Sequence, residues 1–195
     1  QLESDPYSND YFPATVQIDN HSYSNAKVRY RGLSSRNFPK KSWKMKLPSG
    51  SKYADGWGYS RRVFNLNAQY TDPTMMREKL SYDIMEMLDV ISPRARFVRL
   101  QVNGEYRGIF VDVENPRTDF FAARFLDDRG SLYQAEDSKL EELTTSLEYV
   151  GPFEKKLREE EPFDDLSTFI SALHGWPDTA AQLPSDINQE ALLRY

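Results

Sequence analysis

The stretch Arg96-Phe-Val-Arg-Leu-Gln-Val-Asn103-Gly104-Glu-Tyr-Arg-Gly-Ile-Phe-Val-Asp-Val-Glu114 carries the clearest structural signal in the chain. Asn-Gly supplies the two positive-φ residues of a type I′ turn, and apolar residues flank it on both sides, so the stretch predicts a β-hairpin. A two-residue loop at Asn103-Gly104 would set Val98 opposite Ile109 and Phe97 opposite Phe110. Both faces of the hairpin would then be apolar, which predicts central strands that are covered on both sides.

Further strands are predicted on the N-terminal side of this hairpin. Weak alternation over residues 13–31, interrupted by turn-forming residues 20–25, indicates a second hairpin. Residues 42–47 place Trp43, Met45 and Leu47 on one face and two lysines on the other, as in a half-buried strand. Residues 62–67 follow a glycine-rich loop and are predicted to form one more strand.

Helices are expected mainly toward the C-terminus. Asp72-Pro73 has the residue types that open a helix, along which Met76, Leu80, Ile84 and Leu88 form one apolar stripe. A helix is also predicted over 118–126 and a short strand over 131–134. From Ser138 onward the pattern is helical and acidic, with a last helix over 188–195.

This order of elements predicts an α+β fold. Residues 1–115 would form a β-rich part with one helix, and residues 116–195 a mostly helical part. A length of 195 residues suits one domain, or two small lobes that share a core.

Composition excludes several classes of function. The formal net charge of −5 argues against a dedicated nucleic-acid-binding domain. The chain has no cysteine and only two histidines, His21 and His174, so it has neither a disulfide framework nor a multi-histidine metal site. No apolar run approaches the roughly 20 residues that a membrane-spanning helix needs.

Positive charge is nevertheless concentrated in one stretch. Between Asp19 and Asp55 there is no acidic residue, and the basic residues there are Lys27, Arg29, Arg31, Arg36, Lys40, Lys41, Lys44, Lys46 and Lys52. Lys27, Lys44 and Lys46 could equally be the solvated outward side chains of strands, which hinder aggregation.

The loop from Arg31 to Lys41 within this stretch has the chemistry of an anion site. Gly32 would allow a close backbone approach, Ser34 and Ser35 offer hydroxyl donors, and Arg36, Lys40 and Lys41 add cations. The spacing matches neither a Walker A loop nor a GxGxxG turn, so an anion or polyphosphate site is one interpretation among others.

Two residues outside the loop are further candidates. Arg77 could reach a phosphate from its helix, although a helical arginine is more often part of a surface ion pair. Glu114 ends a strand that is predicted to be buried, where a carboxylate needs a partner or a ligand.

Several of these motifs, taken in order, resemble the CotH kinase family, which is named after spore coat protein H. The matching pieces are Arg31-Gly-Leu-Ser-Ser-Arg-Asn-Phe-Pro-Lys-Lys-Ser-Trp-Lys-Met-Lys-Leu47, Asn65-Leu-Asn67 with Asp72 and Met76-Arg77, Pro93-Arg-Ala-Arg-Phe-Val-Arg99, Val102-Asn-Gly-Glu-Tyr-Arg-Gly-Ile-Phe110 with Glu114, and Leu132-Tyr133. Two positions depart from the family pattern. Leu33 stands where the family usually has Asn, and Gln134 where it has Lys.

The resemblance implies an atypical protein-kinase-like fold that transfers the γ-phosphoryl group of ATP to Ser/Thr of protein substrates with Mg²⁺ or Mn²⁺. The β-rich part would be the N-lobe, with the Gly32 loop over the phosphates. Lys40 would pair with the phosphates, with Lys41 as second choice, and Glu114 would lie near the ribose or adenine. The helix of Arg77 would replace the regulatory helix of the lobe.

The resemblance also bears on what the chain would do alone. The family's catalytic Asp and Asn and its Trp-Asp-Leu-Asp-like metal-binding stretch are expected after Tyr195. This chain, an N-lobe with the beginning of a helical C-lobe, would therefore not be catalytic by itself. Relatives imply an extracellular, spore-coat or cell-surface location. Two alternatives are a non-catalytic surface module on the same fold, and a glycan-binding β domain with exposed Trp43 and Trp57.

Overall fold

The computed structural model describes residues 2–54, 56–124, 130–135 and 140–175. The chain divides into two compact units, Gln1–Ala123 and Arg124–Tyr195. Each unit is described by itself. Together they contain strands and helices in the proportions of an α+β protein, as predicted, and no described helix is long and apolar enough to cross a bilayer.

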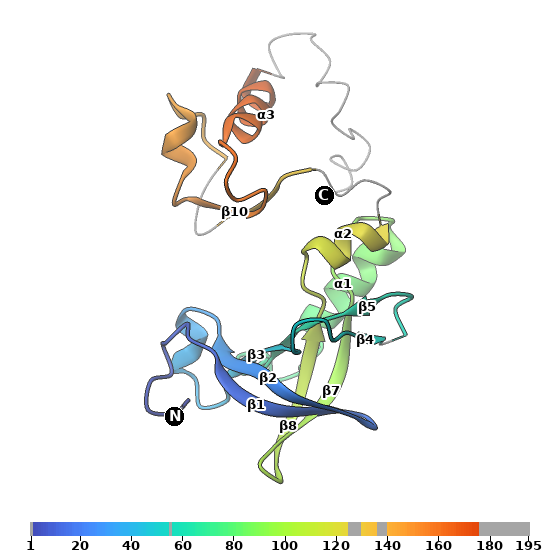
Figure 1. The fold of residues 1–195 in the computed structure, drawn as a ribbon. Coiled ribbons are helices and arrows are strands. Elements are labelled where there is room, and N and C mark those ends of the chain that lie inside the picture. The colour runs from blue at the N-terminus through green and yellow to red at the C-terminus, as the bar shows by residue number, and fades with distance from the viewer. Residues whose placement is uncertain (1, 55, 125–129, 136–139, 176–195) are drawn as a thin grey trace. The chain divides into compact units, whose positions relative to one another are not determined.

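A curled six-stranded antiparallel sheet forms the first unit (Figure 1). Its order is β1-β2-β3-β6-β8-β7, and the bounds are β1 Phe12–Ile18, β2 His21–Arg31, β3 Ser42–Lys46, β6 Val63–Asn67, β7 Ala95–Val102 and β8 Glu105–Val113. A two-stranded ribbon of β4 (Tyr53–Ala54) and β5 (Ser60–Arg61) precedes β6. The predicted N-terminal hairpin is present, with its turn at Asp19-Asn20, earlier than expected.

The sheet has two chemically different faces because its strands alternate. Val28, Met45 and Phe64 are successive neighbours across β2, β3 and β6, and they line the concave face. The next rung, Arg29, Lys44 and Asn65, points to the outer face. The main core therefore lies on the concave side, and the outer side carries the basic residues of β2 and β3.

An ion cluster closes one end of the concave face. Arg61 and Asp112 are both almost fully buried and form an ion pair, and Arg96 Nε lies 3.1 Å from Asp112 Oδ2. The guanidinium of Arg61 also stacks between the rings of Trp57 and Phe64, at 4.4 and 4.2 Å from their centroids. This pairing compensates for the burial of the charges.

The central hairpin is confirmed, but its register and position differ from the prediction. Gln101 pairs with Tyr106 around Asn103-Gly104 as expected, and beyond them an extra residue in β8 shifts the pairing, so that Val98 faces Phe110. Gly108, with φ of +103°, provides the left-handed conformation for this bulge. β7 is also an edge strand, and Phe97 on it is 45% exposed.

Helix α1 (Arg77–Met87) packs against the outer face in an unexpected orientation. Tyr82 contacts Ala95, Val111 and Val113, whereas the predicted apolar stripe of Met76, Leu80, Ile84 and Leu88 faces away and is exposed. The helix also begins later than predicted. Asp72 caps its first turn by accepting a hydrogen bond from the Arg77 backbone N–H at 2.9 Å.

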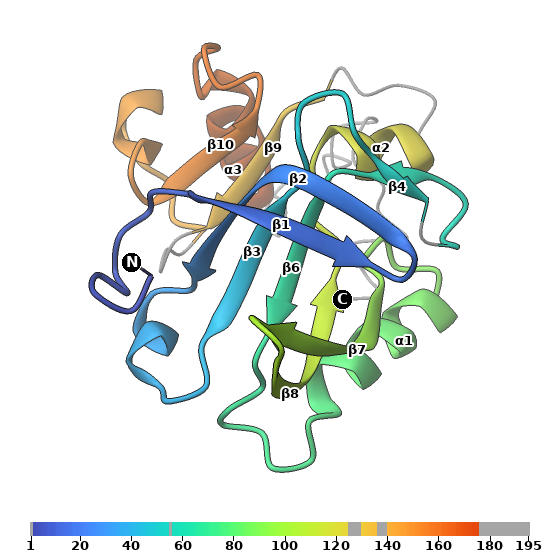
Figure 2. The ribbon, with the colours of Figure 1, turned by 60° about the horizontal axis from the view of Figure 1, so that its bottom comes forward.

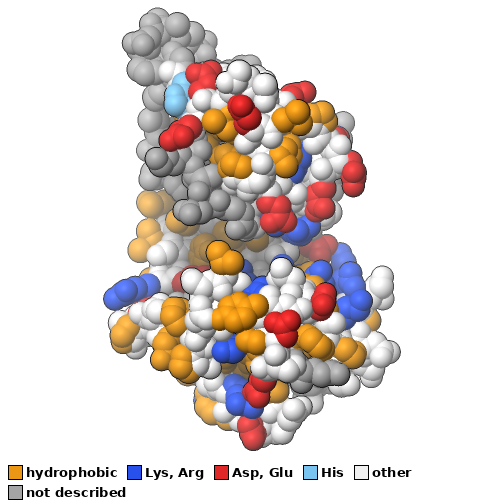
Figure 3. Space-filling model, turned by 90° about the vertical axis from the view of Figure 1, so that its left-hand side faces the viewer, with side chains coloured by type: hydrophobic (Ala, Val, Ile, Leu, Met, Phe, Trp, Pro, Cys, Tyr) orange, Lys and Arg blue, Asp and Glu red, His pale blue; other side chains and the backbone are white. Residues whose placement is uncertain are grey.

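The second unit has a small core of its own. Helix α2 (Thr118–Arg124) leads into it, and it contains β9 (Leu132–Ala135), the 3₁₀ turn Ser146–Tyr149, β10 (Phe153–Leu157) and α3 (Asp164–Gly175). Tyr149, Phe153, Leu166 and Ile170 are buried together. Figure 3 shows acidic side chains spread over the surface of this unit.

The second unit is less helical than the sequence suggested. β10 was not predicted, and it pairs with β9 because Phe153 and Lys155 of its alternating sequence point into the core. The helix predicted over 188–195 lies outside the described residues.

The exposed fractions of two phenylalanine side chains predict very different losses of stability when each is replaced by alanine. Phe64 is 2% exposed and belongs to the main core, so Phe64→Ala should lower the free energy of unfolding by about 3–5 kcal/mol in urea denaturation. Phe97→Ala is the matched control on the edge strand, and it should cost less than about 1.5 kcal/mol. Equal losses would contradict the assignment of the core to the concave face.

Candidate functional site

Lys44 on the outer face of β3 is the centre of a cluster of like charges. The pKa of Lys44 is lowered from 10.5 to about 8, mainly by burial and in addition by repulsion from the surrounding cations Arg31, Arg29, Arg117 and Lys46. Within the described part of the chain, Lys44 has no hydrogen-bond or ion-pair partner. These five residues are called the cationic cluster below.

The surroundings of Lys44 contain further unsatisfied polar atoms. Asn65, its neighbour on β6, is only 3% exposed, and its side-chain oxygen has no hydrogen-bond partner among the described residues. Nε of Arg29, across from Lys44 on β2, is buried without an acceptor there as well. Buried polar atoms of this kind normally have a partner, and they mark a place where a polar ligand would fit. Lys27, by contrast, is exposed, as expected for a solvated strand face.

A hydrogen-bonded network joins the cationic cluster to helix α1. Arg31 donates to the side-chain oxygen of Asn67, and Asn67 Nδ2 donates to Glu78 Oε1 at 2.6 Å. Gln69 also donates to Glu78. Burial raises the pKa of the Glu78 carboxyl, although the amides and Arg31 oppose this shift. The carboxylate of Glu78 thus places negative charge near Arg31, and it fixes the position of the Arg31 guanidinium through Asn67.

The Gly32 loop borders a cavity of about 320 Å³ next to this network. Gly32, Ser35 and Lys40 line it from one side, and Gln69 and Tyr70 of the loop after β6 line it from the other. Figure 2 shows both loops at the same end of the sheet, and the rings of Phe38 and Tyr70 stack with centroids 5.2 Å apart. Gly32 has φ of +103°, and a Cβ there would lie 1.8 Å from Ser35 Oγ, so this position requires glycine.

Lys40 lines the same cavity, but its ammonium already has partners. Nζ donates to the backbone carbonyl of Ile109 at 2.6 Å and lies 4.4 Å from the centroid of the Phe110 ring. Burial lowers the pKa of Lys40. A ligand in the cavity would therefore have to share the ammonium with the Ile109 carbonyl in the middle of β8.

Three other predicted residues of the loop point elsewhere. Arg36 is buried and donates to the carbonyls of Tyr7 and Ser8 and to the side chain of Asn9. Lys41 donates to the carbonyl of Phe38 at 3.0 Å, and Ser34 is exposed outside the cavity lining.

The two candidates outside the loop do not join the cavity. The side chain of Arg77 is 75% exposed, and its Nε lies 3.5 Å from Asp72. Glu114 is buried and accepts a hydrogen bond from the backbone N–H of Arg94 at 2.9 Å, so it has the partner that its burial requires. It lies one residue past the end of β8 and five residues after Ile109, which places it roughly 16 Å from the carbonyl that Lys40 contacts.

Sequence reasoning missed Lys44, Asn67, Gln69 and Glu78 as site residues. Lys44 and Asn67 could have been found by following the strand alternation from Arg31, because all three side chains share the outer face. Glu78 follows Arg77 directly, and only the orientation of α1 determines which of the two turns toward the sheet. No group of three or more His, Asp or Glu residues in the described ranges is arranged to hold a metal ion.

Comparisons with known proteins agree on one protein family for this chain. The family described as CotH kinase protein matches residues 28–195. The chain is 32% identical over 197 residues to inner spore coat protein H of Bacillus subtilis (strain 168), which covers 97% of this chain and 52% of that protein. It is 35% identical over 91 residues to invasin CotH2 of Rhizopus delemar, which covers 46% of this chain and 14% of that protein. The chain thus spans about half the length of the spore coat protein.

Removing Arg36 should release the N-terminal segment from the Gly32 loop. Arg36→Met deletes three hydrogen bonds to residues 7–9, so chymotrypsin should cleave after Tyr7 and Tyr11 several times faster in limited proteolysis. Lys41→Met removes a neighbouring cation whose ammonium contacts Phe38 and Tyr30 and forms no hydrogen bond or ion pair to residues 7–9, and it should leave the rate unchanged. Equal rates in all three proteins would contradict this role of Arg36.

Proposed function

The chain belongs to the CotH kinase protein family, and from this premise we propose that it is the nucleotide-binding part of an ATP-dependent protein kinase. In the full-length protein, the reaction would transfer the γ-phosphoryl group of ATP to Ser or Thr of protein substrates. The β-rich unit would serve as an N-lobe in a kinase-like fold.

The observation that carries the proposal is the half-buried charge of Lys44, which no described residue compensates. Keeping a lysine ammonium partly desolvated among four other cations is costly unless an anion is bound there. The triphosphate of ATP supplies several negative charges within a few ångströms, which suits a cationic cluster much better than a single carboxylate would.

Each residue of the site has a defined task in this scheme. Lys44 and Arg31 neutralise phosphate oxygens, and Glu78 holds Arg31 in place through Asn67. Gly32 allows the loop backbone to approach the phosphates, and Ser35 offers a hydroxyl donor. Lys40 remains a second phosphate ligand in the cavity wall, whereas Lys44 lies beyond the wall, two residues along β3 from the lining residue Ser42. ATP supplies the phosphoryl group that is transferred, with Mg²⁺ or Mn²⁺ as its counter-ion.

A coat or surface location is also part of the proposal. Two relatives are described as a spore coat protein and an invasin. Proteins of such surfaces would also be the substrates, which we expect to be rich in Ser and Thr.

Substitution of Lys44 should specifically weaken nucleotide binding. Because Lys44→Met removes one charge-assisted contact to the phosphates, it should lower ATP affinity by roughly 10- to 100-fold. Calorimetric titration with ATP and Mg²⁺ or Mn²⁺ measures this change. Lys27→Met is the matched control, because Lys27 is an exposed lysine that also lies on the outer face of the sheet.

Lys40→Ala distinguishes the two lysines. Because the Ile109 carbonyl already holds the Lys40 ammonium, its loss should weaken ATP binding less than the loss of Lys44. Strong ATP binding that neither variant weakens would refute the phosphate site. Absence of ATP binding by the full-length protein would favour the non-catalytic surface module.

Nucleotide affinity should fall at alkaline pH. A Lys44 ammonium with a pKa of about 8 is mostly charged at pH 7.5 and mostly neutral at pH 9, so ATP affinity should drop by roughly tenfold across this window. Lys44→Met should show a flat profile over the same range. A fall of the same size in that variant would assign the pH dependence to another group.

A further inference from the structure

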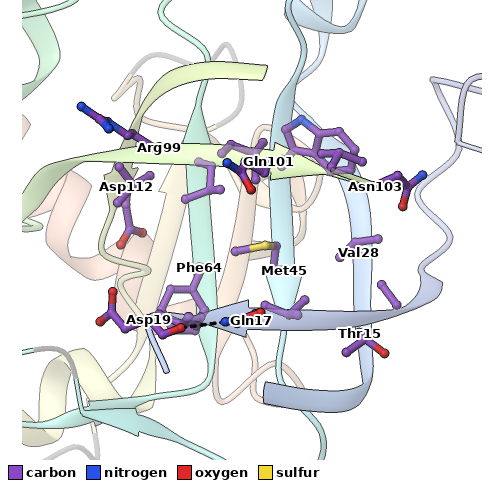
Figure 4. A pocket seen from close by; sticks show the side chains of 18 of the residues that line it. Thr15, Gln17, Asp19, Val28, Met45, Phe64, Arg99, Gln101, Asn103 and Asp112 are labelled. Atoms are coloured by element: carbon purple, nitrogen blue, oxygen red, sulfur yellow. Dashed lines mark hydrogen bonds between the residues drawn. The ribbon is translucent and has the colours of Figure 1, made fainter. Parts of the chain in front are cut away.

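A second cavity lies on the concave face of the sheet, away from the cationic cluster. It has a volume of about 610 Å³, and Figure 4 looks into it, with β7 along one side and β1 along the other. Val28, Met45 and Phe64 form its floor, and Val98 and Leu100 of β7 add apolar surface at the side. The cavity therefore lies in the opening between the two outer strands of the sheet.

The two strands that border this opening differ in how well their edges are protected. Each ends the sheet, so each has one row of backbone groups that pairs with no other described strand. β1 contains Pro13 and an irregularity between Ala14 and Val16, both of which hinder the addition of another strand. β7 contains no proline, and its pairing with β8 is regular from Ala95 to Leu100.

The charges on β7 define what its edge would accept. Arg96 is already paired with Asp112, whereas Arg99 is exposed and has no ion pair or hydrogen bond with any described residue. β7 itself contains no acidic residue. A second copy of the same strand would place arginine near arginine, so charge complementarity favours an acidic partner over self-association.

We propose that β7 binds an extended acidic peptide from a protein partner, which adds to the sheet as a seventh strand. Its backbone would pair with the free edge over Phe97–Gln101. Alternate apolar side chains would enter the cavity beside Val98 and Leu100, and an acidic side chain on the other face would pair with Arg99. This site is independent of the proposed nucleotide site, because its cavity lies on the concave face and its edge strand β7 is separated from β3 by β6 and β8.

Selection from a displayed library of random nonapeptides against this chain tests the proposal. We expect enrichment of sequences in which apolar and acidic residues alternate. A selected peptide should perturb the backbone amide NMR signals of β7 more than those of β1. Arg99→Glu should weaken its binding at least about tenfold, whereas Arg107→Glu, which changes an exposed arginine on β8, should not.

N-methylation separates strand addition from simple apolar binding. Methyl groups on alternate backbone nitrogens of the selected peptide should abolish binding when they face β7, and should have little effect when they are moved by one residue. The proposal is overturned if no peptide is enriched, if Arg99→Glu leaves the affinity unchanged, or if both methylation patterns bind equally.

Discussion

The register of β2, β3 and β6 is the constraint on which the rest of this structure depends. It sets Val28, Met45 and Phe64 in one row and Arg29, Lys44 and Asn65 in the adjacent row. Because side chains alternate between faces, a slip of one residue in β3 would carry Lys44 and Lys46 into the core and expel Trp43 and Met45. The core and the cationic cluster are thus produced by the same pairing, and neither can change without the other.

The outer face of the sheet keeps charges that do not stabilise the fold. The burial of Arg61 is compensated by Asp112, whereas Lys44 has no comparable partner in the described residues. Both are basic side chains of the first unit, but Arg61 belongs to the two-stranded ribbon and Lys44 to the six-stranded sheet. The ion pair of Arg61 is complete in itself, whereas the cationic cluster retains unfavourable energy, which bound phosphate would relieve under the proposed function.

Local signals predicted the strands well, and contacts between distant residues determined what was missed. Asn103-Gly104 fixed the central hairpin, because turn chemistry is local, but the bulge at Gly108 shifted the pairs that a uniform register implies. The stripe on α1 was predicted from periodicity alone, yet Tyr82 and Glu78 are the residues that contact the sheet. The loop around Arg36 gave no indication that its guanidinium binds a segment 27–29 residues earlier. Periodicity shows that a helix has an apolar face, and only tertiary contacts decide where that face points.

The neighbouring positions 32 and 33 differ sharply in how freely they can change during evolution. Gly32 is restricted by its backbone angle and by Ser35, so almost any replacement would reshape the loop. Leu33 is 86% exposed, so a different side chain there would extend into solvent. This explains how the chain can carry Leu where the family usually has Asn without altering the cavity wall. Sequence divergence at the rim of this loop is therefore compatible with an unchanged cavity surface beneath it.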